Sequence, residues 1–337
     1  MIFGQVLDDE EIPTSAAGNF QGYDDTGNWQ QDSLYGIQFR AELEDGLSAT
    51  GQITGRGYEN YDATVTWAYL TYQFNEEFSI KAGRQRLPYY MYSDFLDVGY
   101  AYHWISPPTE VYAIGQFDNF DGISFEYLTE IRNWTSRLSL SGGSTTTIVD
   151  IGTTSSEIKT QEFIVFAWSL NYDWFTLRLG HSQTDVSLDF YTDFADNIDR
   201  IISINGPGLT AEQYKNLSAE GKRTNFDSLG LTGDWGRFFA IAEYKRAQVE
   251  DAPFSVDNSA WYLSGGIRHN QFTFHFTYAE EDMEDNEKTV EAVQAVRPTL
   301  QQIAGGVIGN ALEQATAAQL LQSLDILYLG GFELGNL

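Results

Sequence analysis

Over most of its length the sequence alternates apolar and polar residues with a period of two. In the first clear example, Tyr35, Ile37 and Phe39 fall on one face. Gln38 and Arg40 fall on the other. Such alternation is typical of β-strands whose two faces meet different surroundings. The pattern predicts thirteen strands, at 33–44, 47–57, 63–74, 78–86, 122–131, 134–143, 161–172, 175–186, 226–235, 238–248, 260–269, 272–280 and 324–334.

The connections between these predicted strands alternate between short and long. The short ones are 44–46, 75–77, 132–133, 173–174, 236–237 and 269–271. The long ones are 58–62, 87–121, 144–160, 187–225, 249–259 and 281–323. Up-and-down barrels of outer membranes have this layout, with tight turns on one side and long extracellular loops on the other. The sequence therefore predicts an all-β transmembrane antiparallel barrel that forms one domain, 1–337.

Charged and aromatic residues support the membrane setting. No run of about 18 apolar residues exists, so a transmembrane helix is not expected. Instead the chain has 8 Trp, 20 Tyr and 22 Phe. Many lie near strand ends, as in the aromatic girdles of membrane proteins: Trp67, Trp134, Trp174, Trp235 and Trp261. Period alone does not tell the inner face from the outer one, so a secreted β-sandwich or β-helix is the alternative.

Several classes of chemistry find no support in the residues. A formal net charge of -29 opposes binding to nucleic-acid phosphates. The chain has no cysteine, and its four histidines do not show metal-ligand spacing. Ser228 lies in an Asp-Ser-Leu sequence that lacks the preceding glycine of a lipase motif. We therefore expect no catalytic residues, no metal site and no cofactor, apart from Ca²⁺ held loosely by acidic loops or used to bridge lipopolysaccharide.

Two of the long connections, 187–225 and 281–323, are expected to be extracellular and to contain short helices. Thr210 and Gln213 have the spacing of a capping box, and Gly221 follows as a stop signal, which predicts a helix over 210–220. Apolar residues recur at helical spacing within 289–323, where three glycines interrupt the pattern. Such helices either pack on the rim of the barrel or form a separate binding element.

The stretch 81–112, KAGRQRLPYYMYSDFLDVGYAYHWISPPTEVY, resembles Gram-negative outer-membrane porins. It is most similar to the DcaP-like, dicarboxylate-type porins, and the resemblance covers about 30–145 well. The resemblance implies a trimeric barrel of 16 strands. It also implies that the third extracellular loop, 87–121, folds inward and constricts the lumen.

The predicted strand count departs from this family. Thirteen is odd, whereas bacterial single-chain barrels have even numbers of strands. Either residues 1–7 supply a fourteenth strand, or the chain is an incomplete barrel of the 16-stranded type. We favour the second interpretation, because an open barrel would leave unpaired backbone groups in lipid.

Charged residues on the polar face and in the third loop are the candidate pore residues. They are Arg40, Arg56, Lys81, Arg84, Arg86, Asp94, Asp97, Arg137, Arg178 and Arg268. A basic wall opposite acidic loop residues would create a transverse field, and guanidinium groups bind carboxylates well. This predicts a weak anion preference beneath an acidic mouth. The alternative is that these charges are solvated and give no net preference.

These observations favour an outer-membrane porin of a Gram-negative bacterium. Its water-filled channel would let ions and small hydrophilic solutes, including small carboxylates, diffuse passively. Its expected partners are outer-membrane lipid, lipopolysaccharide and two further copies in a homotrimer. The alternative is a non-transport surface β-protein whose long loops bind a partner or a sugar.

Overall fold

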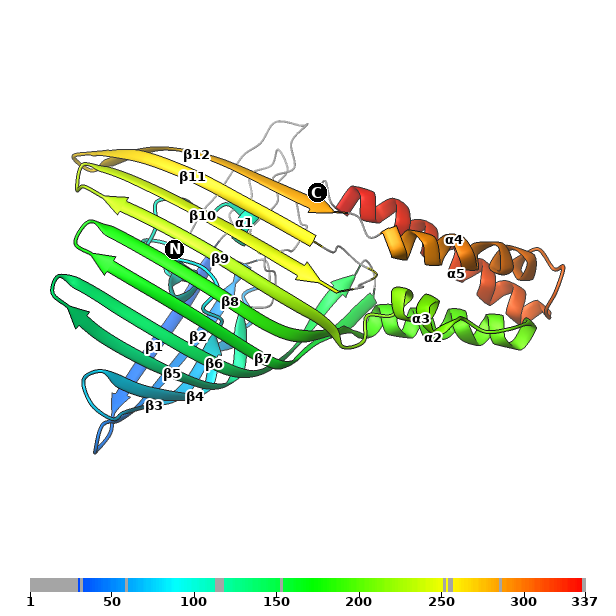
Figure 1. Ribbon diagram of the computed structural model, residues 1–337, viewed down its shortest axis with the longest axis horizontal. Helices are drawn as coiled ribbons and strands as arrows, with labels where there is room; N and C mark the ends of the chain where they lie inside the picture. The colour runs from blue at the N-terminus through cyan, green and yellow to red at the C-terminus, as the bar shows by residue number, and fades with distance from the viewer. Residues whose placement is uncertain are drawn as a thin grey trace.

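The structure, a computed structural model, describes residues 30, 33–57, 60–112, 118–151, 154–250, 253, 257–284 and 287–334. Within them, twelve strands form one sheet in sequence order, each antiparallel to the next (Figure 1). They are β1 (Leu34–Glu42), β2 (Leu47–Arg56), β3 (Thr64–Gln73), β4 (Phe78–Arg86), β5 (Asn119–Ile131), β6 (Trp134–Ile151), β7 (Thr154–Tyr172), β8 (Phe175–Leu188), β9 (Lys222–Asp234), β10 (Phe238–Val249), β11 (Asp257–His269) and β12 (Phe272–Glu284).

The first twelve predicted strands are confirmed, and the thirteenth is wrong. Residues 324–334 belong to a helix, α5 (Ala311–Leu334). Its residues Leu320 and Leu324 are both buried, four positions apart, as expected for one face of a helix. The count in the described part of the chain is therefore twelve strands, and neither thirteen nor sixteen. The strand considered for residues 1–7 lies outside the described residues.

The predicted loop 144–160 is also wrong, because β6 and β7 continue through most of it. The two strands remain paired from Thr145 with Thr160 to Ile151 with Thr154. The sequence between them is rich in β-branched residues, including Thr145-Thr-Thr-Ile-Val149. These two strands therefore extend well past their neighbours on the side of the long connections (Figure 1).

The two faces of the sheet differ sharply, and the apolar face is the exposed one. On β12, Phe272, Phe274, Phe276 and Tyr278 share one face, and Phe276 is 75% exposed. The opposite face of β2 carries buried Ser, Thr and Gln residues. We call the apolar face the outer face and the polar one the inner face. A soluble barrel would reverse this arrangement, so the exposure pattern is that of a barrel whose outer face meets lipid.

Helices occupy the connection between β8 and β9 and the segment that follows β12, and they pack together beyond the ends of the strands (Figure 1). They are α2 (Asp189–Asn205), α3 (Ala211–Leu217), α4 (Glu287–Ala304) and α5, which we call the helical cluster. Its own apolar core includes Ile198, Leu300 and Ile303, each fully buried. The cluster therefore stabilises itself by apolar burial and needs little contact with the sheet.

The predicted helix signals are largely confirmed. Thr210 and Gln213 form the expected capping box at the start of α3. That helix ends earlier than predicted, with Ser218 as its C-cap, while Gly221 has φ +58° and precedes β9. The glycine-containing segment 305–310 separates α4 from α5, as the sequence indicates. The sequence did not predict α2.

The sheet curls around its inner face, and its first and last strands are its edges. Within the described residues, β1 pairs only with β2 and β12 only with β11.

Among those residues, none of the helices has the length and apolar character needed to span a membrane.

Candidate functional site

The connection between β4 and β5 crosses the inner face of the sheet. We call residues 87–118 the inner loop; its part 113–117 lies outside the described residues. It contains a short 3-10 turn, Ser93–Phe95, and the single-turn helix α1 (Thr109–Tyr112). Its side chains and backbone bond to strands from β2 to β12, so the loop lies inside the curled sheet.

The first anchor of the inner loop lies on β8 and β9. Arg178 donates from Nη2 to the carbonyl oxygen of Pro88 at 2.9 Å and from Nη1 to Ser169 Oγ at 3.1 Å. Ser228 Oγ donates to the carbonyl oxygen of Tyr89 at 2.6 Å. Gly180 lies at this crossing, where a Cβ would stand 3.1 Å from the carbonyl oxygen of Tyr89. These contacts hold the entry of the loop against the wall.

The second anchor is Glu243 on β10, whose carboxylate is buried and accepts three hydrogen bonds. Oε1 accepts from the backbone N–H of Met91 at 2.7 Å. Oε2 accepts from the hydroxyls of Tyr112 and Tyr262, the latter at 2.6 Å. Met91 and Tyr112 lie at opposite ends of the described loop, so a single carboxylate fixes both ends.

Aromatic rings fill the space between the inner loop and strands β9–β11. Tyr89 packs on Phe226 with ring centroids 4.5 Å apart, and Tyr90 packs on Tyr112 at 4.8 Å. Tyr90 and Tyr262 are almost completely buried. This packing makes the loop a fixed part of the wall on that side.

The third anchor is on β12. Trp104 donates from Nε1 to Thr277 Oγ1 at 2.8 Å. The neighbouring His103 ring lies 4.9 Å from the ring of His275 and 4.3 Å from that of Phe239, measured between centroids. Burial, together with the nearby charges of His275 and Arg268, lowers the pKa of His103 to about 4. The His103 side chain is therefore neutral at physiological pH.

The fourth anchor is a network of two arginines and two aspartates. Asp97 of the inner loop bonds Arg56 of β2 at 2.9 Å and Arg86 of β4 at 2.5 Å. Asp118, at the end of the loop, bonds the same two guanidinium groups at 3.2 and 3.1 Å. Burial on its own would raise the pKa of Asp97, but Arg86 and Arg56 together hold it below its usual value.

The predicted pore residues separate into several groups. Arg56, Arg86, Asp97 and Arg178 come together around the inner loop, as described above. Lys81 faces inward and pairs with Glu126 at 2.6 Å. Arg40 pairs with Glu42 at 2.7 Å on the edge strand β1, where both are exposed. Arg268, near the short turns, forms a bidentate pair with Asp234. Arg137 of β6 and Asp94 of the inner loop are exposed.

The prediction that Arg84 lines the pore is wrong. Arg84 pairs in register with Ala68 and Asp121, whereas the inward-facing Lys81 pairs with Thr71 and Ser124. Neighbouring residues of a strand point to opposite faces, so residues three apart cannot share one. Arg84 therefore lies on the outer face, where it forms a bidentate pair with Asp121.

Sequence reasoning did not identify Asp118, Glu243, Trp104 and Ser228 as the residues that hold the inner loop in place. Ser228 serves as a hydrogen-bond donor to the loop backbone. The partners of Glu243 lie 19 to 152 residues away, so local patterns contain no signal for them. The one available signal was that Glu243 alternates with the apolar outer-face residues of β10.

The charges near the inner loop are mostly compensated in direct pairs. Asp97 and Asp118 neutralise Arg56 and Arg86, so these residues do not oppose one another across open space as the transverse-field hypothesis requires. Arg137 and Arg178 remain on one inward-facing row of the sheet, with Ser169 between them. Within the described residues, neither has a carboxylate bonded to it. Because Arg178 is bonded to the carbonyl oxygen of Pro88, the exposed Arg137 is the main positive charge left to act on a solute.

No protein-family model matches the sequence, and a comparison with curated proteins gives no match. Among solved structures, the outer-membrane channel DcaP of Acinetobacter baumannii is 11% identical, with a TM-score of 0.54 over 87% of this chain and 78% of that one. The fold is that of an outer-membrane channel. OmpF of Salmonella typhi, solved with daunomycin, is 12% identical, with a TM-score of 0.47 over 74% of this chain and 71% of that one. A loop-deleted OmpT, an outer-membrane protein of Vibrio cholerae, is 10% identical, with a TM-score of 0.36 over 75% and 86%.

These neighbours are outer-membrane porins and channels, and the predicted resemblance to the DcaP-like fold is confirmed. The comparison with DcaP, at this identity, concerns the architecture of the barrel. The solute has to be argued from the residues of this chain.

Proposed function

We propose that this protein is an outer-membrane porin of a Gram-negative bacterium that lets small hydrophilic solutes diffuse passively. The observation that carries the proposal is the inner loop, which is bonded to the wall of a sheet whose outer face is apolar. A loop held inside a membrane barrel narrows the water-filled lumen, but it does not fill the lumen as a packed core would. No bond-making step is needed for this function.

The passage is expected along the inner face of β2–β6, away from the strands that hold the aromatic packing. The solvent-accessible part of that wall is polar, with Lys81, Glu126, Arg137 and Ser139 on it. Such side chains replace part of the hydration of a passing solute. We infer a weak preference for anions, including small carboxylates, because Arg137 on β6 presents an exposed guanidinium group to this face.

The test is planar-bilayer conductance of the complete protein under a salt gradient. We expect stepwise ohmic openings, in groups of three if the protein is a homotrimer, and a reversal potential of anionic sign. A folded, heat-modifiable protein that gives no conductance would contradict transport. In that case the helical cluster would be the first surface to examine for a binding role.

A further inference from the structure

The apolar belt of the outer face is interrupted on β8 and β9 by three cross-strand pairs of polar side chains. The pairs are Arg223 with Asp185 at 2.8 Å, Gln183 with Asn225 at 3.0 Å and His181 with Asp227 at 2.8 Å. The β7 residues in register with the last two pairs, Ile164 and Phe166, are apolar and exposed. The polar surface therefore extends further toward the short turns on β8 and β9 than on β7. We call the three pairs, together with Glu162 of β7, the polar notch.

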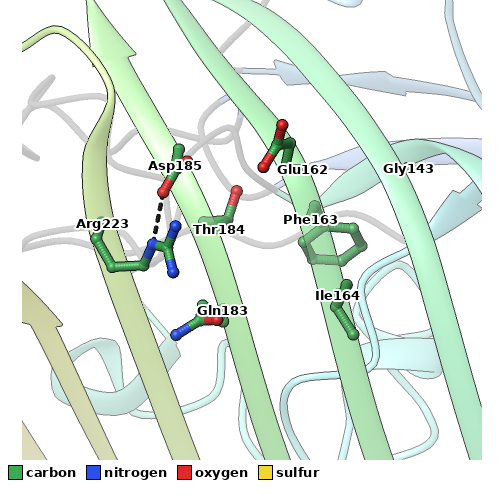
Figure 2. Close-up of a pocket in the computed structure, with 8 residues that line it drawn as sticks. All are labelled: Gly143, Glu162, Phe163, Ile164, Gln183, Thr184, Asp185 and Arg223. Carbon is green, nitrogen blue, oxygen red and sulfur yellow. Dashed lines mark hydrogen bonds and ion pairs between the residues drawn. The ribbon is translucent and has the colours of Figure 1, made fainter.

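A hollow of about 280 Å³ deepens the polar notch where β7 meets β8 (Figure 2). The hollow exists because β7 bulges: its pairing with β8 changes register between Gln161 and Ile164. Glu162 in the bulge has φ +50°, a conformation that residues other than glycine rarely adopt. Bulges re-aim side chains and are common beside binding sites. Here the bulge turns Glu162 toward the same space as Asp185 and Arg223 (Figure 2).

The position of the polar notch decides which lipid it meets. At the short-turn end of these strands, Trp174 stacks on Trp235, as aromatic girdles do at a membrane interface. Short turns of bacterial barrels lie on the periplasmic side, and long connections lie outside the cell. The notch is on the side of the long connections, so it meets the outer leaflet. In a Gram-negative outer membrane this leaflet is lipopolysaccharide, whose membrane anchor, lipid A, has a phosphorylated glucosamine disaccharide as its headgroup.

The side chains of the notch have free bonding capacity for such a headgroup. Arg223 donates from Nε to Asp185, and its side chain is 47% exposed. Within the described residues, its terminal nitrogens make no hydrogen bond, so they are open to a phosphate. Glu162 is exposed and forms no ion pair with any described residue. Its carboxylate and the exposed amide of Gln183 are suited to exchange hydrogen bonds with sugar hydroxyls.

The charges of the hollow favour a sugar that carries a phosphate over a phosphate alone. Asp185 compensates Arg223, and Glu162 leaves the hollow with a net negative charge. That charge disfavours a lipid whose headgroup offers little beyond its phosphate. Hydroxyl groups are neutral and donate to carboxylates, so a phosphorylated sugar gains contacts that offset the repulsion.

We propose that the polar notch binds the headgroup of lipopolysaccharide, with one glucosamine ring in the hollow. The phosphate of that ring accepts hydrogen bonds from the terminal nitrogens of Arg223. Its sugar groups bond to Glu162 and Gln183, and acyl chains lie along the exposed Ile164 and Phe166. The inference rests on the membrane location proposed above and is independent of transport.

The experiment is native mass spectrometry of the complete folded protein in detergent, both with Mg²⁺ and with EDTA. The probes are lipid A, the same lipid A without its phosphates, and phosphatidylglycerol, which carries a phosphate but no sugar. The variants are Arg223→Gln and Gln183→Ala. Arg84→Gln is the matched control, because Arg84 is also an outer-face arginine paired with an aspartate, but it lies outside the hollow.

We expect the wild-type protein to retain lipid A in preference to the other two probes, with Mg²⁺ and with EDTA. Arg223→Gln should lower retention of lipid A about tenfold, the effect of losing one charge-assisted contact, and should not change retention of the phosphate-free form. Gln183→Ala should lower retention of both forms about fivefold, because it removes a contact to the sugar. Arg84→Gln should change none of these values.

Four results would overturn the proposal. Phosphatidylglycerol retained as well as lipid A would mean that the sugar is not recognised. A loss in Arg223→Gln that is the same for both forms of lipid A, or the same as in Arg84→Gln, would mean that Arg223 does not bind the phosphate. Retention only with Mg²⁺ would mean a lipid bridged by a divalent cation. Loss of oligomers in Arg223→Gln, with lipid retention unchanged, would mean that the notch is a contact between copies.

Conductance measured on the same samples separates this inference from the proposed function. Preference for lipid A without conductance would contradict transport only. Conductance without preference for lipid A would contradict the lipid site only.

Discussion

Two carboxylates hold the inner loop in place, and their surroundings are opposite in kind. Asp97 belongs to the loop and is met by the charged groups of Arg56 and Arg86 on the wall. Glu243 belongs to the wall and is met by neutral donors, two of them from the loop. The first anchor depends on compensation of charge, and the second on hydrogen-bond geometry in a buried aromatic setting. The same replacement of a carboxylate by an amide should therefore have unequal effects.

The largest effect is expected from Asp97→Asn. The variant removes one of the two carboxylates that Arg56 and the almost fully buried Arg86 share within the described residues. Breaking a buried ion pair from one side costs about 3 kcal/mol or more. We expect a loss of that size in urea unfolding of the protein in liposomes, and a wider, noisier channel. An unfolding midpoint equal to that of the wild type would show that Asp118 alone compensates both arginines.

A smaller effect is expected from Glu243→Gln. The amide keeps one acceptor oxygen but turns an NH₂ group toward donors, so one of its three hydrogen bonds is lost. The cost should be about 1–2 kcal/mol, with the loop released at one end only. Urea unfolding and single-channel noise measure both effects. Glu126→Gln on β5 is the control, because Glu126 is an inward-facing glutamate whose ion pair with Lys81 is partly exposed and lies away from the loop. If Glu243→Gln destabilises the protein as much as Asp97→Asn does, the contrast between the two anchors is wrong.

The sequence predicted the membrane-spanning part well because each strand there has one face toward lipid and the other toward water, so apolar and polar residues must alternate along it. Where β6 and β7 extend past the lipid, both faces meet water, the alternation fades, and the prediction ended at 143. The segment 324–334 contains apolar residues at both strand and helix spacings, and only packing of Leu320 and Leu324 in the helical cluster decides for a helix.

Two properties of the site could be predicted: which face of a strand each residue occupies, and which residues belong to the loop that the family resemblance identifies. Arg56 and Asp97 were identified, but their direct contact joins residues 41 apart and was not visible in the sequence. The error at Arg84 was avoidable, since it and Lys81 are an odd number of residues apart. Arg86 shares the parity of Arg84 but reaches Asp97 because it is the last residue of β4, where the chain turns into the loop.

A third, pH-dependent effect distinguishes the β12 anchor from the two carboxylates. The pKa of His103 falls from 6.5 to about 4 in the folded protein, so the docked loop favours the neutral ring. The neutral His103 ring therefore stabilises the docked loop fully above pH 6.5, and this stabilisation is lost progressively as the pH falls toward 4. Once protonated, His103 is also repelled by the positive charges of His275 and Arg268. We expect channel closures or noise to increase over that range. In His103→Asn this dependence should disappear; if it persists, another group is responsible.

The smallest expected effect is on selectivity, and it separates the compensated charges from the uncompensated ones. Arg137 is exposed on the inward-facing row that also holds Arg178, whereas Lys81 is paired with Glu126. One charge about 8 Å from an ion in water contributes roughly 0.5 kcal/mol, or about a twofold change in relative permeability. Arg137→Gln should therefore move the reversal potential toward cation preference by that factor.

The paired charges provide the comparison. Lys81→Gln would leave Glu126 uncompensated and move the reversal potential in the same direction. The double variant with Lys81→Gln and Glu126→Gln removes a neutral pair, so it should have no effect on the reversal potential. A reversal potential that responds to the loss of the pair but not to Arg137→Gln would mean that the passage runs along β4 and β5 and that Arg137 lies away from it.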